Sequence, residues 1–205
     1  MVGFWERAVV PRVVDKACGV KPMRKLRAET VDGLHGVVVE IGFGSGHNLP
    51  FMPDDVEVLL AVDPSEIGQK LASGRLADST VPVEFVGLDG QELPLDSESA
   101  DAALSTFTLC TIPDVKRALG EVHRVLKSGG ELHFLEHGLS PQPKVAKWQH
   151  RLTPLQRKLF GGCHFDRPID TLVADSGLEL VTLRNLYVPG PKTPGYIYLG
   201  TARKL

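Results

Sequence analysis

One short stretch of the chain combines a carboxylate with three closely spaced glycines. Glu40 is followed by Gly42, Gly44 and Gly46 in the sequence EIGFGSG, directly after the β-branched residues 37–39. An apolar run of this kind is typical of a strand buried on both faces of a parallel sheet. Glycines after it allow a tight turn and the close approach of a ligand. The stretch therefore predicts a strand ending in a ligand-binding loop, with a purely structural glycine turn as the alternative.

The spacing of the glycines restricts the ligand. The dinucleotide fingerprint G-x-G-x-x-G would need a glycine where this chain has His47, and no lysine follows the loop as it does in phosphate-binding loops. A carboxylate at position 40 would repel a pyrophosphate, whereas it suits an ammonium group. S-adenosylmethionine carries an amino acid at one end, a nucleoside at the other and no phosphate, so it fits this pattern.

Two further acidic residues follow predicted strands. Asp63 ends the apolar run 57–62 and lies about 20 residues past the glycine loop, where an acid can accept hydrogen bonds from ribose hydroxyls. The alternative is a helix N-cap formed by Asp63 or Ser65. Asp89 and Gly90 follow the third predicted strand, where they could meet the amino group and a ring nitrogen of adenine. The alternative there is an ordinary Asp-Gly turn.

The elements that must position these residues alternate along the chain. Strands are predicted over 37–41, 57–62, 81–86, 99–106 and 131–136, and helices over 4–18 (with a break at Pro11), 22–31, 67–77 and 113–127, the last ended by a glycine turn at 128–130. Strands that alternate with helices predict a doubly wound parallel sheet. All the loops named above then lie at carboxyl ends of strands, where open α/β sheets bind ligands.

Length, charge and cysteine content narrow the class of protein. The chain has 205 residues, enough for one α/β domain, and a net charge of −2, which argues against nucleic-acid binding. Its apolar runs are too short to span a membrane. The three cysteines, Cys18, Cys110 and Cys163, are far apart and form no disulfide framework or zinc motif. A reducing, cytoplasmic location is expected.

The motifs resemble those of the class I S-adenosylmethionine-dependent methyltransferases, in particular the methyltransferase 11 type. The resemblance covers about residues 36–138 and rests on EIGFGSG (40–46), AVDPS (61–65), LDGQELP (88–94) and EVHRVLKSGGELHFLEHG (121–138). It implies an α/β, Rossmann-like, doubly wound sheet of seven strands in three α/β/α layers. The final strands would be 178–187 and 196–202, with the last one antiparallel.

The resemblance also implies roles for individual residues. The glycine loop and Glu40 would hold the methionine part of the donor, Asp63 the ribose, and Asp89 with Gly90 the adenine. S-adenosylhomocysteine would be the product. The predicted donor-binding residues are Glu40, Gly42, Phe43, Gly44, Gly46, Asn48, Asp63, Pro64, Asp89, Gly90, Thr106 and Phe107.

Within this class the chain is similar to microsomal thiol methyltransferases and their bacterial relatives. The shared features are the segments 107–110, 135–137, 148–149 and 161–163. The hydrophobic N-terminal anchor of the microsomal members is not seen at the start of the chain. Quinone and phospholipid methyltransferases share the core motifs, so we expect a small, lipophilic acceptor, with a thiol favoured over a phenol, quinone or phospholipid. The rival functions are a nicotinamide-dependent oxidoreductase and a non-catalytic nucleoside-binding module.

The acceptor site is expected outside the core. We divide the single domain into a helical cap (1–35), the cofactor-binding core (36–138), a lid or acceptor insert (139–177) and a C-terminal β-hairpin (178–205). The insert holds an amphipathic segment, 144–160, which is bent at Pro154 and forms either a lid over the cleft or a helix in peripheral contact with a membrane.

Several polar residues near the insert are candidates for chemistry. His137, just past the fifth strand, is the candidate base, with His164 and Asp166 as second choices. Cys163 and His164 lack partners for a metal site, so no metal is expected. Cys110 is expected to be a packed small residue.

Overall fold

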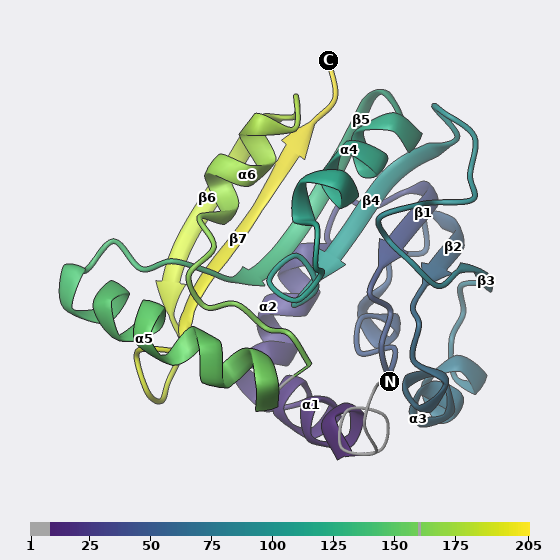
Figure 1. Ribbon diagram of the computed structural model, residues 1–205. Coiled ribbons are helices and arrows are strands. Elements are labelled where there is room, and N and C mark those ends of the chain that lie inside the picture. The colour runs from purple at the N-terminus through teal and green to yellow at the C-terminus, as the bar shows by residue number, and fades with distance from the viewer. Residues whose placement is uncertain (1–8, 160) are drawn as a thin grey trace.

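Seven strands form one twisted sheet in the order β3-β2-β1-β4-β5-β7-β6 (Figure 1). A computed structural model describes residues 9–159 and 161–205 of the chain. The strands are β1 (Gly36–Ile41), β2 (Val56–Val62), β3 (Val83–Gly87), β4 (Ala100–Thr106), β5 (Leu126–His137), β6 (Glu179–Tyr187) and β7 (Tyr196–Arg203). Strand β7 pairs antiparallel with β5 and β6, while the pairs among β1 to β5 are parallel. The predicted seven-stranded sheet with an antiparallel last strand is confirmed.

Helices cover both faces of the sheet. They are α1 (Val10–Cys18), α2 (Lys21–Val31), the short 3-10 helix η2 (Leu49–Phe51), α3 (Glu66–Ala77), α4 (Val115–Val125), α5 (Pro143–Leu159) and α6 (Ile169–Asp175). Helices α4 and α6 share one hydrophobic core with the sheet, and α2, η2 and α3 contribute to the cores on the other face. From β1 the strand order runs toward one edge of the sheet through β2 and β3, and from β4 it runs toward the other edge. The place between β1 and β4 is therefore a topological switch point, where open α/β sheets bind ligands.

Pro11 does not break the N-terminal helix, in contrast to the prediction. Residues 4–8 of the predicted helix, like Phe160 in the insert, lie outside the described residues. Pro11 stands in the first turn of α1 and does not break it. A proline is compatible with that position because the first N–H groups of a helix have no partner inside the helix.

The predicted glycine turn after the fourth helix is instead an irregularity within β5. Helix α4 ends at Val125 and β5 begins at Leu126, so residues 128–130 belong to the strand. The pairing register shifts there between Ala100 and Ala102 of β4. Gly129 has a φ of +83° and donates its N–H to the Lys204 carbonyl at 2.8 Å. The glycines therefore bend the edge of the strand toward the C-terminal segment, a conformation typical of a β-bulge.

Candidate donor-binding and acceptor site

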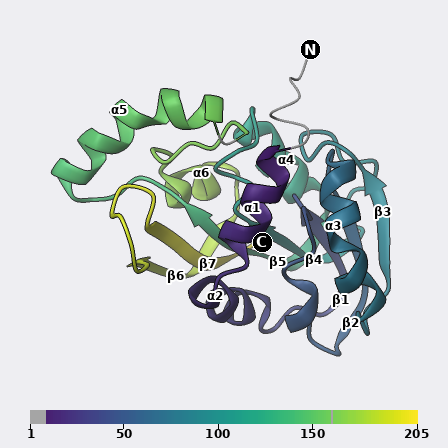
Figure 2. The same ribbon diagram turned by 90° about the horizontal axis from the view of Figure 1, so that it is seen from below.

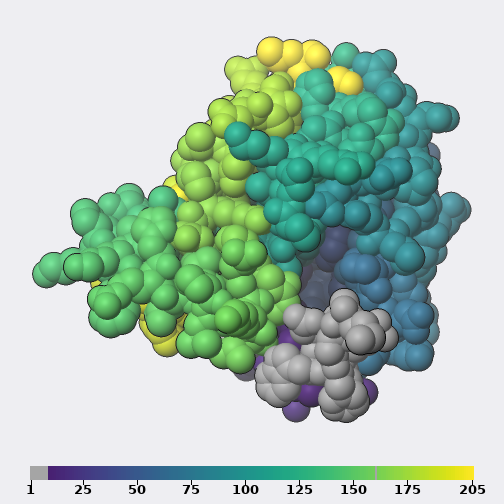
Figure 3. Space-filling view, viewed as in Figure 1, coloured from purple at the N-terminus to yellow at the C-terminus, as the bar shows by residue number. Residues whose placement is uncertain are grey.

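A cavity of about 690 Å³ opens at the carboxyl ends of β1, β2, β3 and β4. Its mouth lies between the teal and green half of the molecule and the blue half (Figure 3). Nine of the twelve predicted donor-binding residues line it, namely Gly42, Phe43, Gly44, Asp63, Pro64, Asp89, Gly90, Thr106 and Phe107. Glu40, Gly46 and Asn48 lie behind this lining. The volume is in the range of about 300–1,000 Å³ that small-molecule sites occupy.

Asp63 joins the tip of β2 to the glycine loop. Its Oδ2 accepts the Gly44 N–H at 2.7 Å and its Oδ1 accepts the Ser65 N–H at 2.7 Å. The N-cap of α3 is Ser65, whose Oγ accepts the Gly68 N–H at 3.0 Å. A carboxylate has about four acceptor positions, so each Asp63 oxygen keeps one for a ligand in the cavity. Burial raises the pKa of Asp63 above its usual value.

The glycine loop owes its shape to residues without a side chain. Gly42 has a φ of +75°, and a Cβ there would collide with the side chain of Thr108 on the neighbouring loop. Gly44 has a φ of +56°, and a Cβ there would meet no side chain within 4 Å. The backbone at Gly44 is therefore open toward the cavity, as a loop that approaches a ligand closely requires.

A buried polar network lies beneath the loop. The Asn48 amide donates to Glu40 Oε1 at 2.7 Å and to Thr106 Oγ1 at 3.0 Å, and Arg27 Nη1 donates to Asn48 Oδ1 at 2.8 Å and to Thr106 Oγ1 at 2.7 Å. Glu40 Oε2 and Arg27 Nε have no hydrogen-bond partner among the described residues. Burial raises the pKa of Glu40 to about 8 and lowers the pKa of Arg27.

Arg27 is a site residue that the sequence interpretation missed. It is only 4% exposed, lines the cavity, and its guanidinium lies 5.3 Å from the centre of the Phe107 ring. A signal was present in the sequence. Met23, Leu26, Arg27 and Thr30 follow the spacing of one helical face, which is buried in α2. A cation on an otherwise inward-facing stripe indicates a charged partner or ligand in the interior.

The loop after β4 is held by a second buried carboxylate. Glu136 is fully buried; its Oε1 accepts from Ser105 Oγ at 2.7 Å and from the Thr108 N–H at 3.0 Å, and its Oε2 accepts from the Cys110 N–H at 3.2 Å. Phe107 lies in the same loop with a φ of +58°, which is rare for a bulky side chain. Glu136 thus positions the loop that presents Phe107 and Thr108 to the cavity. The motif around Glu136 was noticed, but this role was not predicted.

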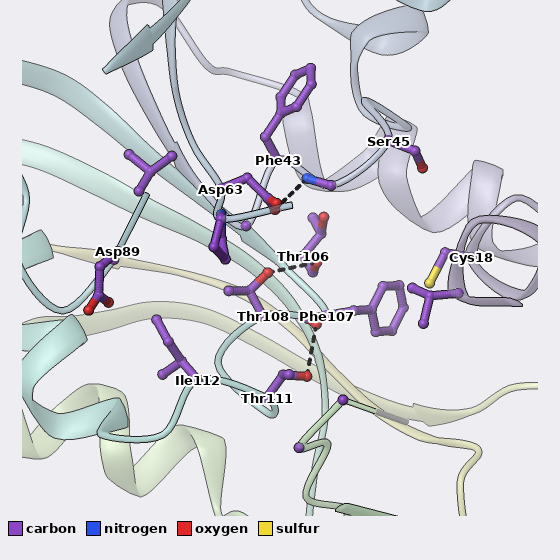
Figure 4. Close-up of a pocket in the computed structure, with 18 of the residues that line it drawn as sticks. Cys18, Phe43, Ser45, Asp63, Asp89, Thr106, Phe107, Thr108, Thr111 and Ile112 are labelled. Carbon is purple, nitrogen blue, oxygen red and sulfur yellow. Dashed lines mark hydrogen bonds between the residues drawn. The ribbon is translucent and has the colours of Figure 1, made fainter. Parts of the chain in front are cut away.

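Asp89 stands at one side of the cavity and Cys18 at the other, with Asp63 between them in the view of Figure 4. Asp89 Oδ1 accepts a hydrogen bond from the Gln91 N–H at 2.9 Å and another from the Gln91 side-chain amide at 2.8 Å. These hydrogen bonds from Gln91 lower the pKa of Asp89, so the carboxylate is charged at neutral pH. Gly90 packs against Ile112, where a Cβ would lie 3.0 Å from the Ile112 side chain.

The candidate base His137 does not line the cavity. Its imidazole packs against Phe107, with ring centres 4.7 Å apart, and its Nδ1 lies 4.0 Å from Cys110 Sγ. The second choices, His164 and Asp166, contact each other at 3.7 Å, and Asp166 also accepts from His150 at 3.0 Å. A proton-transfer role for His137 remains a prediction.

Among the described residues of the insert, two glycines reach the cavity and helix α5 does not. Gly161 and Gly162 line the cavity, together with Val10, Val14 and Cys18 of α1, whereas no residue of α5 does. Helix α5 extends to the side of the sheet (Figure 2). It is anchored by the buried Gln149, which bonds to the Ser140 N–H and to the carbonyls of Gly138 and Thr193 at 2.9–3.1 Å.

The outer face of α5 exposes a stripe of large apolar side chains. Trp148 and Leu155 are each 55% exposed and Leu152 is 37% exposed. Their spacing places them on the same side of the helix. Among the described helices, none has both the length and the apolarity needed to cross a bilayer.

Comparison with known proteins finds methyltransferases. Residues 39–134 match the family model of a methyltransferase domain. A thiol S-methyltransferase of Rattus norvegicus is 34% identical over 134 residues, which are 63% of this chain and 54% of the relative, so the chain spans about half the length of that relative. A phosphatidylethanolamine N-methyltransferase of Cereibacter sphaeroides is 27% identical over 184 residues, covering 85% of this chain and 83% of the relative.

Solved structures share the fold at low identity. An S-adenosylmethionine-dependent methyltransferase from Thermotoga maritima superimposes with a TM-score of 0.67 at 22% identity, covering 98% of this chain and 100% of the other. A geranyl diphosphate methyltransferase in complex with S-adenosylmethionine gives a TM-score of 0.66 at 14% identity, covering 90% and 85%.

The fold defines a Rossmann-like domain with a cavity at the switch point of its sheet. More narrowly, residues 39–134 carry a methyltransferase domain, and the relatives and solved structures described above are methyltransferases, one of them in complex with S-adenosylmethionine. The residues present fit this donor. Among the described residues, the cavity lining offers carboxylates at Asp63 and Asp89 that suit hydroxyl and amino groups and includes no lysine, and Glu40 Oε2 is a buried acceptor without a partner.

Proposed function

We propose that this protein transfers the methyl group of S-adenosylmethionine to a small, lipophilic acceptor, with a thiol favoured over a phenol or quinone. The observation that carries the proposal is the shape of the cavity. It continues from the donor-binding residues to the apolar side chains Val10 and Val14 of α1. An acceptor with an apolar body would be bound there beside the donor.

The donor would be oriented by the chain's own charges. The donor's amino-acid end carries an ammonium and a carboxylate. Near the glycine loop, Arg27 is a buried cation, and Glu40 is a buried carboxyl whose charged form a bound ammonium would favour. Asp63 would accept from the ribose hydroxyls and Asp89 from the adenine amino group. Charge-assisted hydrogen bonds of this kind are roughly twice as strong as neutral ones.

Methyl transfer needs close approach, alignment and little water. When bound, the donor supplies an electrophilic methyl group on a sulfonium. The chain's contribution is to hold both reactants in line, which can supply roughly 7–11 kcal/mol of the barrier. Helix α1 and Gly161–Gly162 cover the cavity and would exclude water from it. An ordinary thiol has a pKa of about 8.5, so a fraction of it is already ionised at neutral pH without a strong base.

The role of Arg27 can be tested with two ligands. Arg27→Met should weaken binding of S-adenosylhomocysteine at least tenfold, because a buried carboxylate would lose its partner. Binding of 5′-methylthioadenosine, which has no amino-acid carboxylate, should change much less. The two affinities can be compared by titration calorimetry. Equal losses for both ligands would contradict the assignment of Arg27 to the amino-acid end.

The acceptor is tested by transfer of a labelled methyl group. The full chain is incubated with labelled donor and a panel of alkyl thiols, aromatic thiols, phenols, quinols and amines. We expect thiols to be methylated fastest, and kcat/KM to rise about fourfold per added methylene, as burial of about 0.8 kcal/mol per CH₂ implies. Preference for small hydrophilic thiols, or no transfer to any member despite donor binding, would contradict the proposal.

A phospholipid headgroup amine is the second candidate acceptor. Two observations favour it, the match to a phosphatidylethanolamine N-methyltransferase over most of both chains and the apolar stripe on α5. Peripheral contact of α5 with a bilayer would bring such a substrate to the site. Vesicles containing phosphatidylethanolamine should then be bound and methylated, and Leu155→Glu should abolish both. Activity confined to soluble thiols would exclude this candidate.

A cytoplasmic location belongs to the same proposal. It is supported by the three cysteines, none of which forms a disulfide in the structure.

A further inference from the structure

Three side chains that bind soft metal ions meet beside the cavity. The ligand atoms of Cys110, His137 and Cys163 all lie within 4.8 Å of one another. Cys110 Sγ is 3.7 Å from Cys163 Sγ and 4.0 Å from His137 Nδ1. The two cysteines are 53 positions apart in the sequence, so only the fold brings them together. Within the described residues, this is the one group of three or more such ligands in mutual reach.

The distances fit a tetrahedral metal centre. Zinc binds thiolate sulfur at about 2.3 Å and imidazole nitrogen at about 2.0–2.1 Å, which at tetrahedral angles places two sulfurs about 3.8 Å apart and a sulfur and a nitrogen about 3.6 Å apart. The sulfur–sulfur distance agrees, and the sulfur–nitrogen distance is a few tenths of an ångström longer. A small rotation of the imidazole, which packs between Phe107 and Phe165, would close that difference.

The charges around the cluster also suit a dication. The Glu136 carboxyl accepts the Cys110 N–H at 3.2 Å, and the Arg167 guanidinium donates to the carbonyls of Leu109 and Ile112 in the same loop. When a dication binds, its two charges are balanced by the two thiolates. Buried charges are tolerated when they are balanced in this way.

We propose that Cys110, Cys163 and His137 bind one zinc ion, which is held by two sulfurs and one nitrogen. Thiolate and imidazole ligands in a tetrahedral arrangement suit zinc among the common metals. Binding forms two zinc–sulfur bonds and one zinc–nitrogen bond, and the two thiol protons are released to solvent. His137 then acts as a metal ligand in place of a base. The separate pair Cys163–His164, considered from the sequence, is not the arrangement in the structure.

Three protein ligands leave a fourth position on the zinc, as in catalytic zinc sites. The cluster adjoins the cavity, because Gly162 and Thr111 both line it and Thr111 Oγ1 lies 3.6 Å from Cys110 Sγ. A thiol bound at the fourth position would be deprotonated by the metal. This last consequence rests on the proposed function, whereas metal binding itself does not.

The test measures metal directly. The full chain is purified under a phosphine reductant, loaded with Zn²⁺ and analysed for metal by mass spectrometry, and a parallel sample is titrated with Co²⁺ to record thiolate-to-cobalt charge-transfer absorption. We expect one metal per chain and about two protons released per Zn²⁺. Cys163→Ser should weaken metal binding at least about 100-fold, since loss of an outer-sphere partner alone costs 10–100-fold.

Two matched controls and a second variant make the result decisive. Cys18→Ser and His164→Ala, which alter a cysteine and a histidine outside the cluster, should keep full metal binding. Should Cys163→Ser fail to fold, as judged by circular dichroism and S-adenosylhomocysteine binding, His137→Gln replaces it. Absence of bound metal after loading of the fully reduced protein, or unchanged metal affinity in the cluster variants, would overturn the proposal. Loss of methyl transfer with intact metal binding would count only against the proposed function.

Discussion

Asp63 holds the glycine loop with the same two oxygens that it would present to the donor. It fixes the Gly44 and Ser65 backbone by hydrogen bonds of 2.7 Å while lining the cavity. A carboxylate tied in this way is oriented before the ligand arrives, so less ordering is needed on binding. The acid was predictable from its place after an apolar run, whereas its contact with Gly44 required the fold to bring two strand tips together.

Replacing Asp63 tests its role in binding. Asp63→Ala should weaken binding of S-adenosylhomocysteine by roughly 1.5–3 kcal/mol, the usual cost of losing a hydrogen bond to a charged group. The measurement is titration calorimetry. Ser65→Ala is the control, since it removes the N-cap of α3 but keeps the carboxylate, and it should cost stability of about 1 kcal/mol with little change in affinity. Unchanged affinity in Asp63→Ala would remove this residue from the site.

Glu40 gives a prediction that depends on pH. Burial raises its pKa to about 8 from the ordinary value of 4.5. Between these values the unfolded chain releases the proton and the folded chain keeps it, so the free energy of unfolding falls as the pH rises, by up to about 1.4 kcal/mol per pH unit. Below pH 4.5 the carboxyl is neutral in both states and the effect vanishes. Glu40→Gln should therefore flatten the stability profile between pH 4.5 and about 8.

Denaturant unfolding of the ligand-free protein across this range measures the effect. Glu57→Gln on β2 is the control, because Glu57 is exposed and should leave the profile as it is. If the free energy of unfolding of Glu40→Gln depended on pH in the same way as that of the unsubstituted protein, the prediction would be contradicted, because Glu40 would then be ionised in the folded chain.

At the scale of elements, most of the strands and helices could be predicted because their apolar residues repeat with clear periods. Residues 128–130 were misplaced for a physical reason. Two glycines after a helix usually mark its end. Here Lys204, just past the end of β7, exchanges backbone hydrogen bonds with Gly129 and Gly130, and the segment forms a bulge of β5. Helix α6 was not predicted either, since its seven residues are too few for a periodic signal.

Helix α5 depends on one polar side chain for its attachment. Gln149 is 1% exposed and makes three hydrogen bonds to the loops beneath the helix. Gln149→Ala should leave a buried carbonyl, a buried N–H and a cavity, and should cost about 2–4 kcal/mol in local stability. We expect faster amide exchange and faster proteolysis across 143–159. Trp148→Ala on the exposed side should change neither, and equal protection in both variants would show that other contacts hold α5.

At the scale of the whole molecule, the sequence allows the sheet and the donor end of the site to be predicted together. Parallel strands place all their carboxyl ends at one edge, so acids and glycines after different strands must converge. Although the sequence analysis expected an acceptor site in the cap and the insert, the apolar side of the cavity could not be predicted in this way. Its lining comes from α1 and Gly161–Gly162, whose contact with the core depends on packing between distant segments. The same holds for Arg27, Glu136 and the cluster at Cys110, which only the three-dimensional fold assembles.

The measurement that tests the central claim most directly is a pair of titrations of the full chain, one with S-adenosylhomocysteine and one with NAD. The account predicts one molecule of S-adenosylhomocysteine bound per chain, displaced by S-adenosylmethionine, and no measurable affinity for NAD. Tight binding of NAD without S-adenosylhomocysteine would contradict it and would identify the cavity as a dinucleotide site.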